Sequence, residues 1–156
     1  MAGNGEEIYP FSWLKRFLAG NENYKPRVDF ICIHRYPHTR DPEEALNNLK
    51  YHLDRVYEEF GLPIWLTEYS MIHFHVGPDG IALFPTEEAQ AQFARESSEL
   101  LESLPYVERY AWFVLDYYTA ERGFDVANIH LYDKNGDVTE VGRAYRDGGR
   151  VLPEKE

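Results

Sequence analysis

Three short apolar runs alternate with two long amphipathic segments, and this alternation restricts the chain to a small set of folds. The runs cover residues 28–34, 64–68 and 107–115. The first of them is a continuous apolar run, which is typical of a strand buried on both faces of a parallel sheet, and the other two are also predicted to be strands. The order strand, helix, strand predicts parallel βαβ units with right-handed crossovers, and therefore an α/β fold.

Each long segment begins with a helix-capping signal and ends at a residue that stops helices. Asp41 precedes a proline at the first helical position, and Gly61 follows the last apolar residue of that segment. The second segment runs from Thr86 to Pro105. Three smaller elements are also predicted: a helix over residues 11–18, a hairpin over residues 129–138 and a last short helix from Val141.

Composition narrows the possible partners. The formal net charge of −11 argues against nucleic acid, because binding to phosphates requires clustered lysine and arginine. Aromatic residues make up 15% of the chain, which is more ring surface than a small core requires, and a sugar-binding cleft would use the surplus. The single cysteine, Cys32, can form no intrachain disulfide and is predicted to be a buried small hydrophobe.

Neither a membrane span nor a signal peptide is recognisable in the sequence. We therefore expect one soluble domain over residues 1–156 without membrane association. Its compartment stays open, since secretion would require a signal upstream of this chain.

Polar and aromatic residues gather where the three predicted strands end, and the carboxyl ends of parallel strands are where α/β folds bind ligands. Taken singly, Glu68 could begin a loop, His34 could be structural and Trp112 could belong to the core. Together, a carboxylate framed by imidazole, phenol and indole groups suits a sugar-cleaving cleft. The candidate residues are Glu68 for catalysis and His34, Tyr36, Tyr69, Trp112 and Asp116 for substrate binding.

Residues 28–36, 61–69, 107–113 and 136–145 resemble the glycosyl hydrolase catalytic core proteins of the glycoside hydrolase family 128 type, which are retaining (β/α)8-barrel glycosidases. The resemblance implies a partial TIM barrel comprising strands six to eight, their helices and a small C-terminal hairpin. It implies that Glu68 is the nucleophile, that His34 and Tyr36 flank it and that Trp112 forms part of a sugar platform. It also implies a poly- or oligosaccharide substrate, in particular a β-1,3-linked glucan, and no cofactor.

The resemblance places the general acid/base at the end of the fourth barrel strand, and nothing upstream of Trp13 could supply it. A retaining mechanism requires two carboxyls about 5 Å apart, and a complete barrel runs to about 250 residues. Three explanations are open: a fragment of a longer product, a trimmed binding or scaffold module, and a piece that assembles with another chain. We favour the fragment, whose partner would be the N-terminal half of the barrel.

Two other classes of function compete with this interpretation. A non-catalytic carbohydrate-binding module would use the same aromatic residues without needing Glu68. A metal hydrolase would use the histidines, of which His73 and His75 form a His-x-His pair. That spacing is common by chance, and the sequence offers no complete ligand set, so we expect no metal.

Overall fold

Three parallel strands form the central sheet of the computed structural model, which describes residues 9–72, 84–115 and 128–150. The strands are β1 (Ile31–Arg35), β2 (Ile64–Tyr69) and β3 (Val107–Trp112), and they lie in the order β1-β2-β3. Both neighbouring pairs are parallel. The predicted α/β fold is therefore confirmed, and each strand overlaps one of the three predicted runs.

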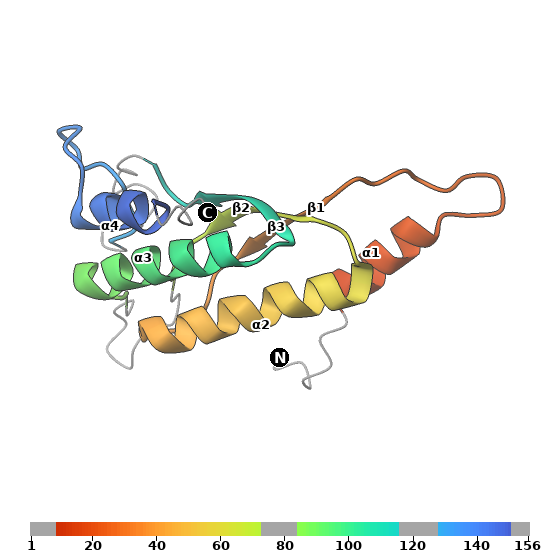
Figure 1. Cartoon of the computed structure of the whole chain (residues 1–156), viewed down its shortest axis with the longest axis horizontal. Coiled ribbons are helices and arrows are strands. Elements are labelled where there is room, and N and C mark those ends of the chain that lie inside the picture. The colour runs from red at the N-terminus through yellow and green to blue at the C-terminus, as the bar shows by residue number, and fades with distance from the viewer. Residues whose placement is uncertain (1–8, 73–83, 116–127, 151–156) are drawn as a thin grey trace, which may run out of the picture.

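The two long helices cover one face of this sheet. They are α2 (Pro42–Phe60) and α3 (Glu87–Ser103), and Figure 1 shows them side by side beneath the strands. The buried side chains of α2 and of the sheet include Leu49, Leu53, Ile64 and Leu66, none of which has exposed surface. This layer between helices and sheet is the main core.

Within the part of the chain that the structure describes, side chains on the opposite face of the sheet are exposed to solvent. Cys32, Thr67 and Ala111 all project there. The prediction that Cys32 is buried is wrong, because it alternates with Ile31 and Ile33 and so points away from α2. The sheet is covered on one face, as a barrel wall is on its outside.

The capping signals act as the sequence predicts. The Asp41 carboxylate accepts hydrogen bonds from the amides of Glu43 at 2.9 Å and Glu44 at 3.0 Å. Gly61 ends α2 in the left-handed conformation with φ +61°, and its amide donates to Tyr57 O at 2.8 Å. The helix boundaries are therefore set by local chemistry that can be identified in the sequence.

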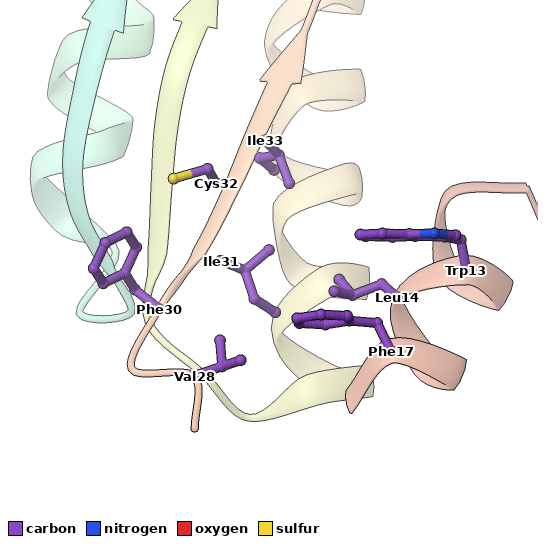
Figure 2. A pocket seen from close by; sticks show the side chains of 8 residues that line it. All are labelled: Trp13, Leu14, Phe17, Val28, Phe30, Ile31, Cys32 and Ile33. Carbon is purple, nitrogen blue, oxygen red and sulfur yellow. The ribbon is translucent and has the colours of Figure 1, made fainter. Parts of the chain in front are cut away.

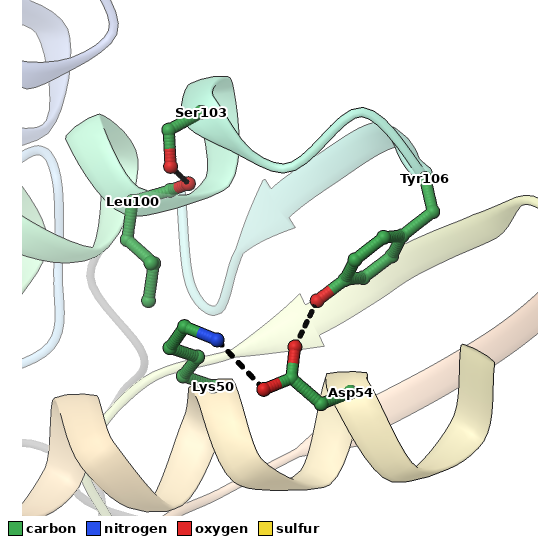
Figure 3. Close-up of polar contacts among 5 residues, drawn as sticks. All are labelled: Lys50, Asp54, Leu100, Ser103 and Tyr106. Atoms are coloured by element: carbon green, nitrogen blue, oxygen red, sulfur yellow. Dashed lines mark hydrogen bonds and ion pairs between the residues drawn. The ribbon is translucent and has the colours of Figure 1, made fainter. Parts of the chain in front are cut away.

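A polar contact joins helix α2 to the residue that precedes β3. Asp54 accepts hydrogen bonds from Lys50 Nζ at 2.7 Å and from the Tyr106 hydroxyl (Figure 3). The Tyr106 ring also stacks on Tyr57, with ring centroids 4.4 Å apart. Together these contacts fix the turn that enters β3.

Two shorter helices complete the described structure. They are α1 (Tyr9–Ala19), which precedes the sheet, and α4 (Glu140–Gly148), which packs on α3 (Figure 1). A Cβ at Gly148 would lie 2.5 Å from Arg95 O, so glycine permits the close approach of α4 to α3. None of the described helices is both long and apolar enough to cross a membrane.

The predicted hairpin is present in reduced form. Only Tyr132 and Val138 form an antiparallel bridge, and the amide of Asp133 donates to Asp137 O at 2.8 Å across the turn. Gly136 occupies this turn with φ +83°. The hairpin leads into Thr139, whose hydroxyl accepts a hydrogen bond from Gly142 N at 3.0 Å and caps α4.

Candidate active site

A β-bulge in β2 places Glu68 on the open face of the sheet. Leu66 points into the core, and strict alternation would send Glu68 the same way. The β1–β2 pairing instead shifts between Ile33 and His34, so that Ile33 lies opposite Leu66 while His34 lies opposite Glu68. One extra residue on β2, Thr67, is accommodated, and Glu68 emerges beside His34.

Two side chains from the end of β1 converge on the Glu68 carboxylate. The Tyr36 hydroxyl donates a hydrogen bond to Oε2, and His34 Nδ1 lies 3.2 Å from the same oxygen. The side chains of His34 and Glu68 are 52% and 37% exposed, so the group remains open to a ligand. These three residues are predicted site residues, and the structure brings them together.

Tyr36 is held as a hydrogen-bond donor by its surroundings. Burial, the hydrogen bond to Glu68 and the negative charge of that carboxylate raise the pKa of Tyr36 well above its ordinary value. The phenol therefore stays protonated at physiological pH and keeps donating to Glu68. A fixed donor on one carboxylate oxygen orients the other oxygen without neutralising the group.

Phe113 is a neighbour of the site that was not predicted from the sequence. Its ring contacts Tyr36 edge to face, with centroids 5.7 Å apart. Behind these two rings lies a small apolar cluster around the buried residues Ile72 and Ile129. Alternation along β3 could have revealed Phe113, because Tyr110 and Trp112 share the helix-facing side and the next residue should face the other way.

Tyr69, which was predicted to bind substrate, lies in the core. Its side chain has no exposed surface and contacts the rings of Phe93 and Trp112 under α3. The residue that follows Glu68 returns to the core face because the bulge is complete after one residue. The prediction that Tyr69 binds substrate is therefore wrong.

Trp112 is also a core residue in this structure. It is 7% exposed, and its indole N–H donates to Ile129 O at 2.7 Å. Its ring packs against Phe93 and Tyr145, with centroids 6.0 Å away in both cases. The predicted sugar platform is wrong for Trp112, because a side chain at this position of β3 faces the helices.

We predict that Trp112→Ala lowers the free energy of unfolding by about 3–5 kcal/mol, the usual cost of deleting a buried large aromatic side chain. Urea denaturation followed by circular dichroism measures this change. Trp13→Ala is a matched control, since Trp13 is 61% exposed and its loss should change stability by less than about 1 kcal/mol. A small effect of Trp112→Ala on stability, together with weaker sugar binding, would return this residue to the substrate site.

The remaining candidates contribute nothing further to the described site. Asp116, the last predicted substrate-binding residue, lies outside the described residues, as do His73 and His75 of the metal hypothesis. Among residues 9–72, 84–115 and 128–150, no three histidine, cysteine or acidic side chains are arranged to hold a metal ion.

The fold and the position of Glu68 together define a class of protein. A parallel sheet with helices on one face matches part of the wall of a (β/α)8 barrel, and Glu68 lies at the carboxyl ends of the strands, the end at which such barrels bind their substrates. The chain belongs to the glycosyl hydrolase catalytic core family, whose sequence model matches residues 2–145. No protein of curated function matches the chain.

Solved structures of glycoside hydrolase family 128 resemble this chain over most of its length. An endo-β-1,3-glucanase of subgroup I from Amycolatopsis mediterranei is 34% identical with a TM-score of 0.73, and the match covers 90% of this chain and 54% of that protein. An exo-β-1,3-glucanase of subgroup V from Cryptococcus neoformans is 26% identical with a TM-score of 0.67, and the match covers 90% and 51%. An endo-β-1,3-glucanase of subgroup II from Sorangium cellulosum is 25% identical with a TM-score of 0.66, and the match covers 97% and 53%. The chain thus spans about half the length of these proteins, and the predicted partial barrel of the family 128 type is confirmed.

Proposed function

We propose that this chain is part of a retaining glycoside hydrolase that cleaves β-1,3-glucan, with Glu68 as its nucleophile. The observation that carries the proposal is the pair of contacts that Tyr36 and His34 make to Glu68 Oε2 at the carboxyl ends of the strands. A carboxylate that is anchored through one oxygen and partly exposed has the geometry that attack on an anomeric carbon requires.

The two catalytic carboxyls of the reaction come from different parts of the barrel, one from this chain and one from the remainder. Glu68 attacks the anomeric carbon while a second carboxyl, about 5 Å away, protonates the departing oxygen, and that second carboxyl then activates water to release the sugar. We propose that the second carboxyl comes from the part of the barrel fold that this chain does not span. Tyr36 and His34 position the nucleophile during both steps.

The solved relatives support the proposed substrate class. The Amycolatopsis enzyme has been crystallised with laminaritriose and laminaribiose and with laminaripentaose, in variants where one or another glutamate is replaced by alanine. We propose β-1,3-glucan as the substrate of this chain because the family and fold are shared and because Tyr36, which contacts Glu68, also contacts the ring of Phe113. Such rings suit the apolar faces of glucose units.

Linkage preference tests the proposal. The measurement uses a completed barrel, which is made by fusing the unmatched segment of the Amycolatopsis enzyme to this chain. We expect cleavage of laminarihexaose at least about tenfold faster than of cellohexaose, which differs only in linkage, because a pocket shaped for one linkage rejects another by about 1.4 kcal/mol or more. Product release is followed by chromatography. Equal rates on both sugars, or cleavage of cellohexaose alone, would contradict the substrate assignment.

Tyr36→Phe tests the positioning role of the phenol in the same barrel. A hydrogen bond to a charged group contributes about 1.5–3 kcal/mol, so we predict that kcat falls by about ten- to hundredfold while KM changes little. Tyr132→Phe is the control, because Tyr132 is 39% exposed and lies on the hairpin. Unchanged kcat in a folded Tyr36→Phe protein would remove Tyr36 from the mechanism.

A further inference from the structure

Glu68 lies where β2 is out of regular register with both neighbouring strands. The pairing with β1 shifts just before His34, and the pairing with β3 shifts between Leu66 and Tyr69. A bulge interrupts the ladder of backbone hydrogen bonds, so the ladder alone does not fix a residue within it. The position of the Glu68 backbone therefore depends on other contacts as well.

The irregularity on the β1 side arises in β2. Along β1, Ile31 and Ile33 point to one side of the strand and Cys32 points to the other (Figure 2). This is the alternation of a regular strand. The extra residue is Thr67 of β2, and its side chain is exposed on the same open face of the sheet as Glu68.

Thr67 connects the bulge to β1. Its hydroxyl donates a hydrogen bond to Ile33 O at 3.3 Å, next to the point at which the register shifts. Threonine on an exposed strand face is also favoured by its β propensity alone. The bond gives this threonine a further role, because it joins the residue before Glu68 to the strand whose end supplies His34 and Tyr36.

Gln90 of α3 holds the backbone on the other side of Glu68. Its side-chain amide donates to Met71 O at 2.6 Å, and the residue has no exposed surface. Glutamine is seldom fully buried, and the neighbouring buried residues Ala91 and Phe93 of α3 are apolar. A polar side chain at this place in the core satisfies the Met71 carbonyl and fixes the chain shortly after Glu68.

We propose that Thr67 and Gln90 are positioning residues for the nucleophile. Their hydrogen bonds hold the backbone on both sides of Glu68 and thereby set where its carboxylate meets the sugar. A displacement of about 1 Å at a reacting group can lower a rate by about a hundredfold, and supporting residues must hold a catalytic group to within about 0.5 Å. The inference rests on the proposed function, since it takes Glu68 as the nucleophile.

The alternative is that both hydrogen bonds only stabilise the fold. Their loss would then lower the free energy of unfolding without changing kcat of the folded protein. Kinetics and stability measured on the same variants separate these two roles.

Steady-state kinetics of the completed barrel on laminarihexaose test the proposal. Thr67→Val removes the hydroxyl and keeps the β-branched shape, whereas Thr67→Ser keeps the hydroxyl. Gln90→Met removes the side-chain donor. Gln92→Met is its matched control, because Gln92 is exposed on the same helix and donates to Glu96 Oε1 at 2.9 Å. Circular dichroism and urea denaturation show that each variant is folded under the assay conditions.

We expect Thr67→Val and Gln90→Met each to lower kcat by about tenfold, as for a small displacement of a reacting group, with KM changed by less than about twofold. Thr67→Ser should keep kcat within about threefold of the wild type, because the hydroxyl remains. Gln92→Met should keep it within about twofold. Combined with Tyr36→Phe, either substitution should cost less than the product of the separate losses, since all act on one carboxylate.

The 156-residue chain itself provides a second readout that requires no turnover. The carboxyl carbon of Glu68, observed by carbon NMR, responds to the hydrogen bond that Oε2 accepts from Tyr36. We expect Thr67→Val and Gln90→Met to move this resonance in the same direction as Tyr36→Phe does. Gln92→Met should leave it unchanged.

Two results would overturn the inference. Thr67→Val and Gln90→Met could keep the wild-type kcat and the wild-type Glu68 resonance while only their stability falls, which would make both residues purely structural. Thr67→Ser and Gln92→Met could instead lose as much activity as the variants that they control, so that the two hydrogen bonds would not be the cause. Full activity of Glu68→Gln would remove the nucleophile assignment itself, so a failure of the proposed function is distinguishable from a failure of this inference.

Discussion

Replacing Glu68 by glutamine in a completed barrel lowers kcat on laminarihexaose by about 10⁴-fold or more, as expected when a nucleophile that acts together with a second catalytic group is removed. The amide keeps the shape of the carboxylate and loses its negative charge and nucleophilicity. Tyr36 and His34 contact Oε2 and hold the Glu68 carboxylate in place at the carboxyl ends of the strands. The rate is measured by steady-state release of reducing sugar.

Two controls make the result specific to the chemical step. Affinity for laminarihexaose, measured by calorimetry, should change by less than about threefold, because the isosteric amide leaves the cleft intact. Glu108→Gln changes an exposed carboxylate that accepts a hydrogen bond from Trp65 Nε1 near the opposite ends of the strands, and it should leave kcat within about twofold. Full activity of Glu68→Gln would eliminate Glu68 as the nucleophile.

The isolated chain should show turnover at background, and completion of the barrel should raise the rate by at least about 10⁴-fold, a difference of about 5.5 kcal/mol in activation free energy. Glu68 alone can hold a sugar and attack it, but the leaving oxygen also requires a proton from a second carboxyl. The comparison uses one substrate with the isolated chain, the completed barrel and the completed Glu68→Gln barrel at equal protein concentrations.

Robust hydrolysis by the isolated chain would contradict this expectation. It would mean that both carboxyls lie within the 156 residues, and each acidic residue would then have to be tested by substitution. Binding without turnover by every assembled form would instead favour a carbohydrate-binding module.

Most of the fold follows from local signals in the sequence. Asp41 and Thr86 cap the helices that they were predicted to begin, and Gly61 ends α2 with the positive φ for which glycine is suited. These features involve a few consecutive residues, so no knowledge of distant contacts is needed. The first strand begins at Ile31, later than the apolar run suggests, because Ile31 N is where pairing to the β2 side starts.

The faces of the strands were harder to predict than the strands themselves. Alternation gives each residue a face only while the register is regular, and the bulge at Thr67 interrupts it just before Glu68. An apolar run gives no sign of such an insertion. Tyr69 returns to the helix-facing side directly after this bulge. Trp112 lies on the same side through regular alternation along β3, while Phe113 lies beside Tyr36.

Cys32 shows a second limit of sequence-based prediction. A continuous apolar strand predicts burial on both faces, and that expectation assumes a complete surrounding structure. The described chain covers only the face toward α2, so Cys32 is exposed. The apolar character of β1 is consistent with a barrel interior on its other side.

Covalent trapping tests the central claim most directly. A retaining enzyme forms a glycosyl ester on its nucleophile, and a 2-fluoro laminaribiosyl fluoride slows the hydrolysis of that ester enough for detection by mass spectrometry. Incubation of the completed barrel with this reagent, followed by proteolysis, should give a single labelled peptide whose fragmentation places the sugar on Glu68. A label on any other carboxylate, or cleavage of laminarihexaose with inversion of the anomeric configuration and no label, would contradict the assignment.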